Sequence, residues 1–240
     1  MPPLDEQQKI ADEIASIDRQ IQDQNAIVQK CEERAKSKFA EMFGDPVNNI
    51  FGYPVTTLKT VAKTPLSYGC TEAAIKYDGK TRYVRITDIM DNGVLGQDIM
   101  SAAKSEDKYL LHDGDILFAR SGATVGKTLR YRASYGRAIY AGFLIRLIPD
   151  RDVIDPDYLY HFTRSDYYWD FVKSTQRVMA QPNINAREYG DLRILLPDLD
   201  VQKRFTSFVQ EIDQSKKEAI DRKSALLSER EAAISRYFRE

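Results

Sequence analysis

The stretch LDVQKRFTSFVQEID, from Leu199 to Asp213, has a second copy, LDEQQKIADEIASID, from Leu4 to Asp18. The copies stay aligned without a gap, 195 residues apart, as far as Phe43 and Phe238. Each copy follows a proline, has an acidic residue in its first turn and then runs about 40 residues without Pro or Gly, which predicts a long helix. The first copy stops at Gly44, a residue type typical of helix C-termini. Two matched helices are therefore predicted to bracket the middle of the chain.

Both copies carry apolar residues at alternating spacings of four and three, which is the seam of a coiled coil. Gln24 interrupts the seam of the first copy, and Lys216 and Lys223 interrupt that of the second. Such seams are buried either against each other or against another subunit, and the spacing leaves both possibilities open. The residues predicted to form the helix interface are Ile10, Ile14, Ile17, Ile21, Val28, Val209, Ile212, Leu226, Ile234 and Tyr237.

The composition describes a folded protein with no global charge bias. Of its 240 residues, 42% are hydrophobic and 30% are charged, and the net charge is −1. Basic residues are nevertheless frequent between Lys59 and Arg137, among Tyr, Ser, Thr and Gly. The polar start does not resemble a secretory signal, and the longest apolar run, Ala138–Ile145, is too short to span a bilayer. Two cysteines and two isolated histidines form no disulfide framework or metal cluster, so we expect a reducing, cytoplasmic location and no bound metal.

The middle of the chain mixes strand and helix patterns. Arg82–Thr87 alternates like a strand, and Thr124–Arg132 and Ala138–Ile148 are predicted to pair as neighbouring strands across a turn. Asp155–Gln176 has proline near its start and many aromatic residues, which predicts a helical region packed on the sheet. The expected fold class is α+β, with one mixed domain between two coiled-coil helices. The predicted boundaries are 1–46 for the first helix, 47–197 for the domain and 198–240 for the second helix.

Ser121–Thr128 nearly matches the phosphate-binding motif G-x-x-x-x-G-K-[ST]. The residue six before Lys127 is Ser121 and the glycine follows it as Gly122, so the loop is one residue short. The next residues predict a strand and a turn rather than the helix that such a loop requires. A nucleotide-binding enzyme of this type is therefore kept as an alternative. No Ser-His-Asp or Cys-His arrangement and no acid–base pair predicts another catalytic centre.

Four stretches together resemble the specificity subunit of type I restriction–modification enzymes, in the order found in that family. They are Tyr83–Ile89, Gly114–Lys127, Gln181–Asn185 and the Leu-Pro-x-Leu-Asp-x-Gln-Lys segment at 196–203. The resemblance implies a non-catalytic target recognition domain that reads half of a split double-stranded DNA site, and helices that dock modification (methyltransferase) subunits. It implies that the restriction subunit joins through the complex, and that S-adenosylmethionine, ATP and Mg are bound by partners and not by this chain.

The chain departs from that family in its length. A complete specificity subunit alternates two recognition domains with two helices, whereas this sequence predicts one domain and two helices. It resembles the C-terminal half of such a subunit or a naturally short version. Two copies pairing through their helices would present two identical readers, so a homodimer with an inverted, gapped target is expected. A coiled-coil scaffold or decoy that no longer reads DNA is a further alternative.

Candidate DNA-contacting residues are cationic, amide, hydroxyl or aromatic residues in predicted loops. Lys and Arg bind phosphates, while Arg, Asn, Gln, Ser and Thr read base edges. A structural role competes at each position: Arg120 can hold its own turn, and Asn183 and Asn185 can cap their loop. The candidates are Ser67, Tyr68, Thr71, Lys76, Lys80, Arg82, Arg120, Ser121, Thr124, Lys127, Arg177, Gln181, Asn183 and Asn185.

Overall fold

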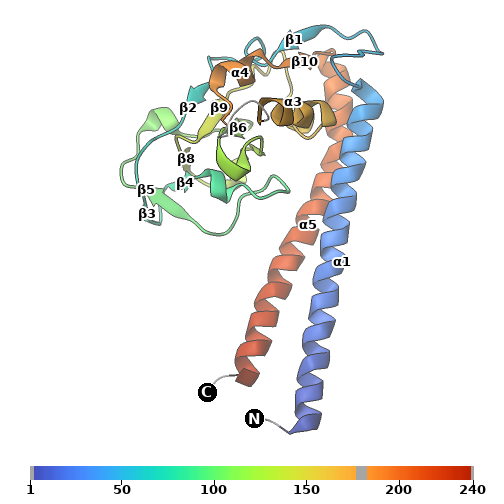
Figure 1. Ribbon diagram of the computed structural model, residues 1–240, viewed down its shortest axis with the longest axis vertical. Helices are drawn as coiled ribbons and strands as arrows, with labels where there is room; N and C mark the ends of the chain where they lie inside the picture. The colour runs from blue at the N-terminus through green and yellow to red at the C-terminus, as the bar shows by residue number, and fades with distance from the viewer. Residues whose placement is uncertain (1–2, 177–182, 239–240) are drawn as a thin grey trace. The chain divides into compact units, whose positions relative to one another are not determined.

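The computed structural model describes residues 3–176 and 183–238 and has the predicted α+β order of a long helix, a β-rich region and a second long helix (Figure 1). Helix α1 spans Leu4–Phe43 and helix α5 spans Leu199–Phe238, so both begin and end at equivalent positions of the internal repeat. Two compact units result. We call Met1–Ser37 with Ser207–Glu240 the helical unit and Lys38–Thr206 the globular unit.

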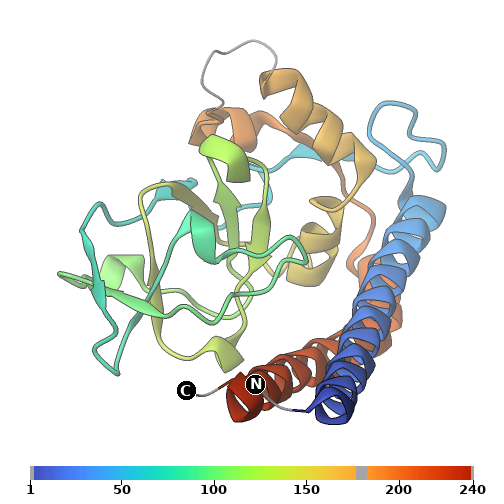
Figure 2. The same ribbon diagram turned by 60° about the horizontal axis from the view of Figure 1, so that its bottom comes forward.

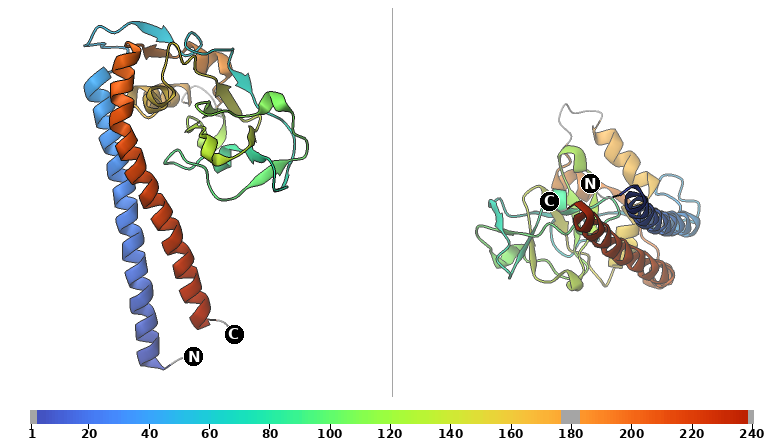
Figure 3. Two further views of the ribbon diagram at one scale, coloured as in Figure 1. Left: turned by 180° about the vertical axis from the view of Figure 1, so that it is seen from behind. Right: turned by 90° about the horizontal axis from the view of Figure 1, so that it is seen from below.

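In the helical unit, α1 and α5 lie side by side and antiparallel (Figure 3). Asp18 pairs with Arg230 at 2.7 Å, and Glu32, further along α1, pairs with Lys216 at 2.8 Å, earlier in α5. Two cations at seam positions of α5 are therefore matched by carboxylates of α1. No helix within residues 3–176 and 183–238 has an apolar stretch long enough to cross a membrane.

The seam of the helical unit is buried more deeply on α5 than on α1. Ile14, Ile21 and Val28 are only partly buried. Among the described side chains of α5, the last buried one is Ala233 rather than the predicted Ile234, because Ala233 continues the four–three spacing from Leu226. The side chain of Tyr237 lies outside the described part of the chain. The buried seam residues are Ile10, Ile17, Ala35, Val209, Ile212, Ala219, Leu226 and Ala233.

The globular unit is built on one antiparallel sheet. Its strand order is β2 (Ser67–Tyr68), β9 (Leu144–Leu147), β6 (Ile116–Ala119) and β7 (Thr128–Arg130). The other pairs are β1 (Val55–Thr57) with β10 (Arg193–Leu195), β3 (Ala74–Lys76) with β5 (Met100–Ala102), and β4 (Arg82–Val84) with β8 (Ala138–Tyr140), the last of these being parallel.

Alternate residues of the main sheet face different layers, as strand geometry requires. On one face, Phe118 contacts Tyr168 of α3 (Asp166–Gln176) and Tyr189 of α4 (Ala186–Asp191), and both helices lie on this side of the sheet (Figure 2). On the other face, Leu117 and neighbouring apolar residues form one buried cluster with the β4–β8 pair. The sheet is thus covered by helices on one face and by a second strand layer on the other.

The predicted pairing of Thr124–Arg132 with Ala138–Ile148 is wrong. β7 pairs with β6, and the apolar run splits at Gly142 into β8, which pairs with β4, and β9, which pairs with β6 and β2. An alternating pattern identifies a strand but not its partner.

Two further stretches are shorter than predicted. The Arg82–Thr87 strand ends at Val84, because the Asp88 carboxylate accepts the Arg85 N–H and forms a 3-10 turn. The helical region divides into α2 (Pro156–Phe162), which is capped by Asp155, and α3.

The start of α5 is locked into the globular unit by Gln202, which is fully buried. Its amide accepts a hydrogen bond from Asp155 N at 2.8 Å and donates to the carbonyls of Pro197 at 2.8 Å and Val153 at 3.3 Å. Three residues later, Phe205 packs edge-on against the rings of Phe39 and Phe43 from the end of α1. The Leu-Pro-x-Leu-Asp-x-Gln segment therefore has a structural role in this chain.

We expect Gln202→Ala to lower the free energy of unfolding of the globular unit by about 2 to 4 kcal/mol, because each buried polar group left unpaired costs about 1 to 3 kcal/mol. The matched control is Gln7→Ala, at the equivalent position of the first repeat, where the side chain is only partly buried. Urea unfolding followed by tyrosine fluorescence measures both variants. Equal losses for Gln7→Ala and Gln202→Ala would contradict this role.

Candidate nucleic-acid interface

Three of the predicted DNA-contacting side chains meet at the end of β6. Arg120 follows the last residue of this strand, and its Nε donates to the side-chain oxygen of Asn183 at 3.1 Å. The guanidinium lies 4.7 Å from the centre of the ring of Tyr68, a residue that is 41% exposed on β2, the strand on the other side of β9. This places a cation, an aromatic face and an amide together, although Tyr68 and Asn183 are more than a hundred residues apart in sequence.

Backbone contacts hold this cluster in place. Ser121 and Asn183 form an isolated β-bridge, and Ile184, which is fully buried, donates its N–H to the Arg120 carbonyl at 2.8 Å. Asn185 caps α4, because its side-chain oxygen accepts the N–H groups of Arg187 and Glu188. The side-chain oxygen of Asn185 therefore caps a helix, which is the structural role that the sequence offered as an alternative to DNA contact.

The Ser121–Thr128 stretch is a short turn between two strands. Residues Gly122–Thr124 form a 3-10 turn in which the Thr124 hydroxyl donates to the Ser121 carbonyl at 3.2 Å. Gly126 has φ 86° and packs so closely that an added Cβ would lie 2.7 Å from Val172 Cγ1. β7 follows instead of a helix, so the near-match lacks the strand–loop–helix context of a phosphate-binding loop.

Lys127 is held by a carboxylate from a distant loop. Its Nζ lies 2.6 Å from Asp91 Oδ1, and the Asp91 side chain is exposed. The hydrogen bond and charge of Lys127 hold the pKa of Asp91 below its usual value. The ammonium group of Lys127 is therefore paired with a carboxylate in this structure.

The other predicted residues fall into different environments. The Ser67 hydroxyl is 2.8 Å from the Tyr140 hydroxyl, while Thr71, Lys76 and Lys80 are exposed. The prediction of Arg82 as a loop residue that contacts DNA is wrong. Arg82 is 7% exposed in β4, and its guanidinium donates a hydrogen bond to the Gly96 carbonyl at 2.6 Å. Burial also lowers the pKa of Arg82. The remaining predicted residues, Arg177 and Gln181, lie outside the described residues.

Two exposed side chains beside the cluster escaped the sequence analysis. Phe143 is 61% exposed in the turn between β8 and β9, and its carbonyl accepts the Arg120 N–H. The Arg187 side chain, in the first turn of α4, is also exposed. The apolar run around Phe143 predicted a buried strand, and the only sequence signal against this was Gly142.

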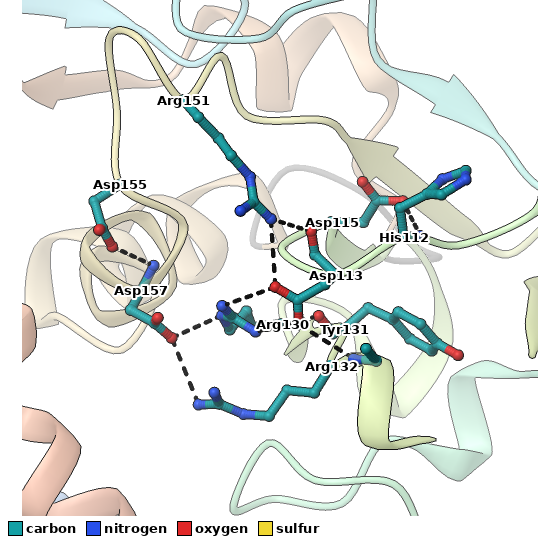
Figure 4. Close-up of polar contacts among 10 residues, drawn as sticks. His112, Asp113, Asp115, Arg130, Tyr131, Arg132, Arg151, Asp155 and Asp157 are labelled. Carbon is teal, nitrogen blue, oxygen red and sulfur yellow. Dashed lines mark hydrogen bonds and ion pairs between the residues drawn. The ribbon is translucent and has the colours of Figure 1, made fainter. Parts of the chain in front are cut away.

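Elsewhere in the globular unit, several arginines are occupied by carboxylates (Figure 4). Arg130 Nε lies 2.7 Å from Asp157 and its Nη1 lies 3.2 Å from Asp113, while Arg132 and Arg151 pair with the same two carboxylates. Burial works to raise the pKa of Asp113, but its bonds to Ala133 N–H, Arg130 and Arg151 hold it below the usual value. This network is structural, and among the described residues no group of His, Cys, Asp and Glu has the arrangement of a metal site.

Comparisons with known proteins agree with this architecture. Residues 57–228 match the family described as the type I restriction modification DNA specificity domain. The chain is 28% identical over 165 residues to the putative type I restriction enzyme MjaX specificity subunit of Methanocaldococcus jannaschii, which covers 68% of this chain and 33% of that protein.

Solved structures share the fold at low sequence identity. The S subunit of a type I restriction–modification system from M. genitalium matches with a TM-score of 0.67 at 15% identity, over 99% of this chain and 62% of that one. The HsdS subunit of Thermoanaerobacter tengcongensis matches with a TM-score of 0.56 at 18% identity, over 100% of this chain and 59% of that one. This chain thus spans about a third of the curated relative and about three fifths of each solved subunit. Because the family match extends over more than half of its length, the chain belongs to the type I restriction modification DNA specificity domain family.

Proposed function

We propose that this chain is a non-catalytic, sequence-reading subunit of a type I restriction–modification complex, and that its globular unit contacts one half of a bipartite duplex. The observation that carries the proposal is the Arg120–Tyr68–Asn183 cluster. An arginine reads guanine with two hydrogen bonds and an asparagine reads adenine, so these side-chain types can distinguish bases. Their mutual contacts fix both side chains before DNA arrives, which lowers the entropy lost on binding.

The remaining candidates divide by chemistry. Lys76, Lys80 and Lys127 are cations suited to phosphates, which position the protein without reading sequence. Ser67, Thr71, Ser121 and Thr124 carry hydroxyls that either bind phosphate or accept and donate at base edges. Arg177 and Gln181 stay in the proposed set because of their side-chain types, and Asn185 stays through its side-chain NH2. The burial of Arg82 removes it from the set.

The helical unit would dock the partners. Modification subunits would bind its outer surface, the restriction subunit would join through the complex, and these partners would hold S-adenosylmethionine, ATP and Mg in the cytoplasm. We also propose a homodimer. Because α5 already buries part of the α1 seam, including Ile10 and Ile17, a second copy would use apolar residues that stay exposed on the helices, such as Ile27 and Leu227.

Methylation mapping tests the function. Cells that express the chain with its modification subunits should gain adenine methylation at one two-part motif with an unread spacer. Methylation that is unchanged when the chain is omitted would overturn the proposal. Tight binding of labelled ATP by the isolated chain would support the nucleotide-binding alternative, and the absence of salt-dependent binding to the mapped duplex would support a scaffold or decoy.

Asp91→Asn should raise the affinity for duplex DNA about two- to fivefold, in line with the 0.2 to 1 kcal/mol typical of exposed charge pairs. Releasing Lys127 to a phosphate should also make the dependence of log affinity on log salt steeper by about one. The matched control is Asp107→Asn, which removes another exposed carboxylate, 3.0 Å from Arg137. Fluorescence anisotropy at several salt concentrations measures both, and an equal change in the two variants would show that only net charge matters.

A further inference from the structure

Phe143 is an exposed aromatic residue in an otherwise buried segment. The residue is 61% exposed, whereas Leu144 and Ile145 after it are fully buried. Within residues 3–176 and 183–238, no aromatic or cationic side chain stacks on this ring. Phe143 therefore offers an apolar surface beside the Arg120–Tyr68–Asn183 cluster.

Hydrogen bonding places the turn of Phe143 beside the Arg120–Tyr68–Asn183 cluster. Ala119 pairs with Leu144, and the next residue, Arg120, donates its N–H to the Phe143 carbonyl at 3.1 Å. On the other side of β9, Tyr68 pairs with Ile145, two residues from Phe143. The Phe143 turn therefore lies between the segments that carry Arg120 and Tyr68.

The turn that carries Phe143 is fixed before any ligand binds. Leu144 N donates to the Ala141 carbonyl at 2.8 Å, and Gly142 N donates to the Cys70 carbonyl at 2.6 Å. An added Cβ on Gly142 would lie 3.1 Å from Thr71 Cγ2, so the backbone is closely packed there. A rigid turn presents the ring at low entropic cost.

We propose that Phe143 inserts between neighbouring base pairs of the target and unstacks them beside the position read by Arg120, an inference that rests on the DNA-reading function proposed above. Apolar side chains that enter a base step in this way kink the duplex and bring more protein surface into contact. The surroundings select DNA over a protein partner, because Arg120, Ser121 and Asn183 combine positive charge with neutral hydrogen-bonding groups. The base step at Phe143 is then selected by how easily it unstacks, which adds specificity without a hydrogen bond.

The test uses the full-length chain with its modification subunits and a duplex selected by that complex from a random-sequence pool. 2-Aminopurine is placed in turn at each position of the selected half-site, because its fluorescence rises when it loses stacking. Modification subunits that flip out their target adenine also brighten a probe at that adenine, so the signal of interest is a second bright position, beside the base read by Arg120, which the unmodified chain should produce. Phe143→Ala should abolish the signal and weaken binding about tenfold, in line with the value of base–aromatic contacts, and Phe143→Leu should retain part of both.

The control variant is Phe51→Ala, another phenylalanine that is 46% exposed but lies outside the cluster, and it should change neither signal. Failure of the unmodified complex to select any duplex would overturn the DNA-reading function itself. Selection of a duplex whose affinity and fluorescence are unaffected by Phe143→Ala would overturn only the insertion. Loss of modification-subunit binding by Phe143→Ala, with DNA binding intact, would assign the ring to a protein contact and would also overturn it.

Discussion

Changing Ile17 and Ile212 to Asp together is expected to separate α1 from α5 and to abolish recognition of a two-part site, while the globular unit stays folded. The two isoleucines are equivalent in the internal repeat and are 4% and 5% exposed within the helical unit. An uncompensated buried charge costs about 3 to 5 kcal/mol. Two buried carboxylates should therefore cost more free energy than the pairing of the two helices contributes. The globular unit has its own core around Leu117, Leu129 and Tyr140 and does not depend on this seam.

The separation is measured by circular dichroism, which should lose a helical transition, and by a bismaleimide cross-link between cysteines introduced at positions 18 and 230, where the native side chains pair at 2.7 Å. The control places Asp at Ile27 and Leu227, which are exposed on the same helices. This control should leave the cross-link intact and dissociate the homodimer. Light scattering that finds the unmodified chain monomeric at micromolar concentration, without modification subunits, would contradict the dimer and leave the helix pairing untouched.

Arg120→Ala is expected to weaken binding to the specific duplex by about 10- to 100-fold, because a bidentate arginine–guanine contact is worth about 1 to 3 kcal/mol. Stability should fall by about 1 to 2 kcal/mol at most, since the variant loses one part-buried hydrogen bond from the guanidinium to the Asn183 amide oxygen and one cation–π contact. Arg120→Lys keeps the charge but not the planar fork, so it should keep non-specific affinity and lose sequence preference.

Competition binding with specific and scrambled duplexes separates these outcomes, and thermal unfolding monitors the fold. Arg137→Ala is the control, because Arg137 is a partly exposed arginine outside the cluster. Its Nη2 pairs with Asp107 Oδ1 at 3.0 Å. Similar losses of affinity and of stability in Arg120→Ala would show that the residue holds its turn and does not read DNA.

The cluster shows how far residue types alone carry a site prediction. Side-chain chemistry alone predicts DNA contacts for Tyr68, Arg120 and Asn183. The structure brings Tyr68 and Asn183 into contact with Arg120 from two other segments of the chain. The same criterion selected Arg82, which tertiary packing buries against the Gly96 carbonyl. It passed over Phe143, because an apolar residue in an apolar run predicts the core. Side-chain type states what a residue can bind, whereas exposure depends on which elements cover it.

The two long helices and the mixed domain between them could be predicted from local sequence patterns alone. Helix formation depends on neighbours three and four residues away and on the absence of Pro and Gly, so these local signals were sufficient. The strand partners could not be predicted in this way, because an alternating pattern does not name the partner: β7 pairs with the strand just before it, β6, whereas β8 pairs with β4, far earlier in the chain.

Gln7 and Gln202 show the same division in one pair of residues. They occupy equivalent positions in matching stretches, and both lie in the first turns of helices that the sequence predicts equally well. Gln202 is fully buried because Asp155, Val153 and Pro197 offer it a donor and two acceptors, whereas Gln7 is only partly buried. Local sequence fixes a helix, but burial is a property of the residues that approach it from elsewhere in the chain, and only the folded structure places those residues.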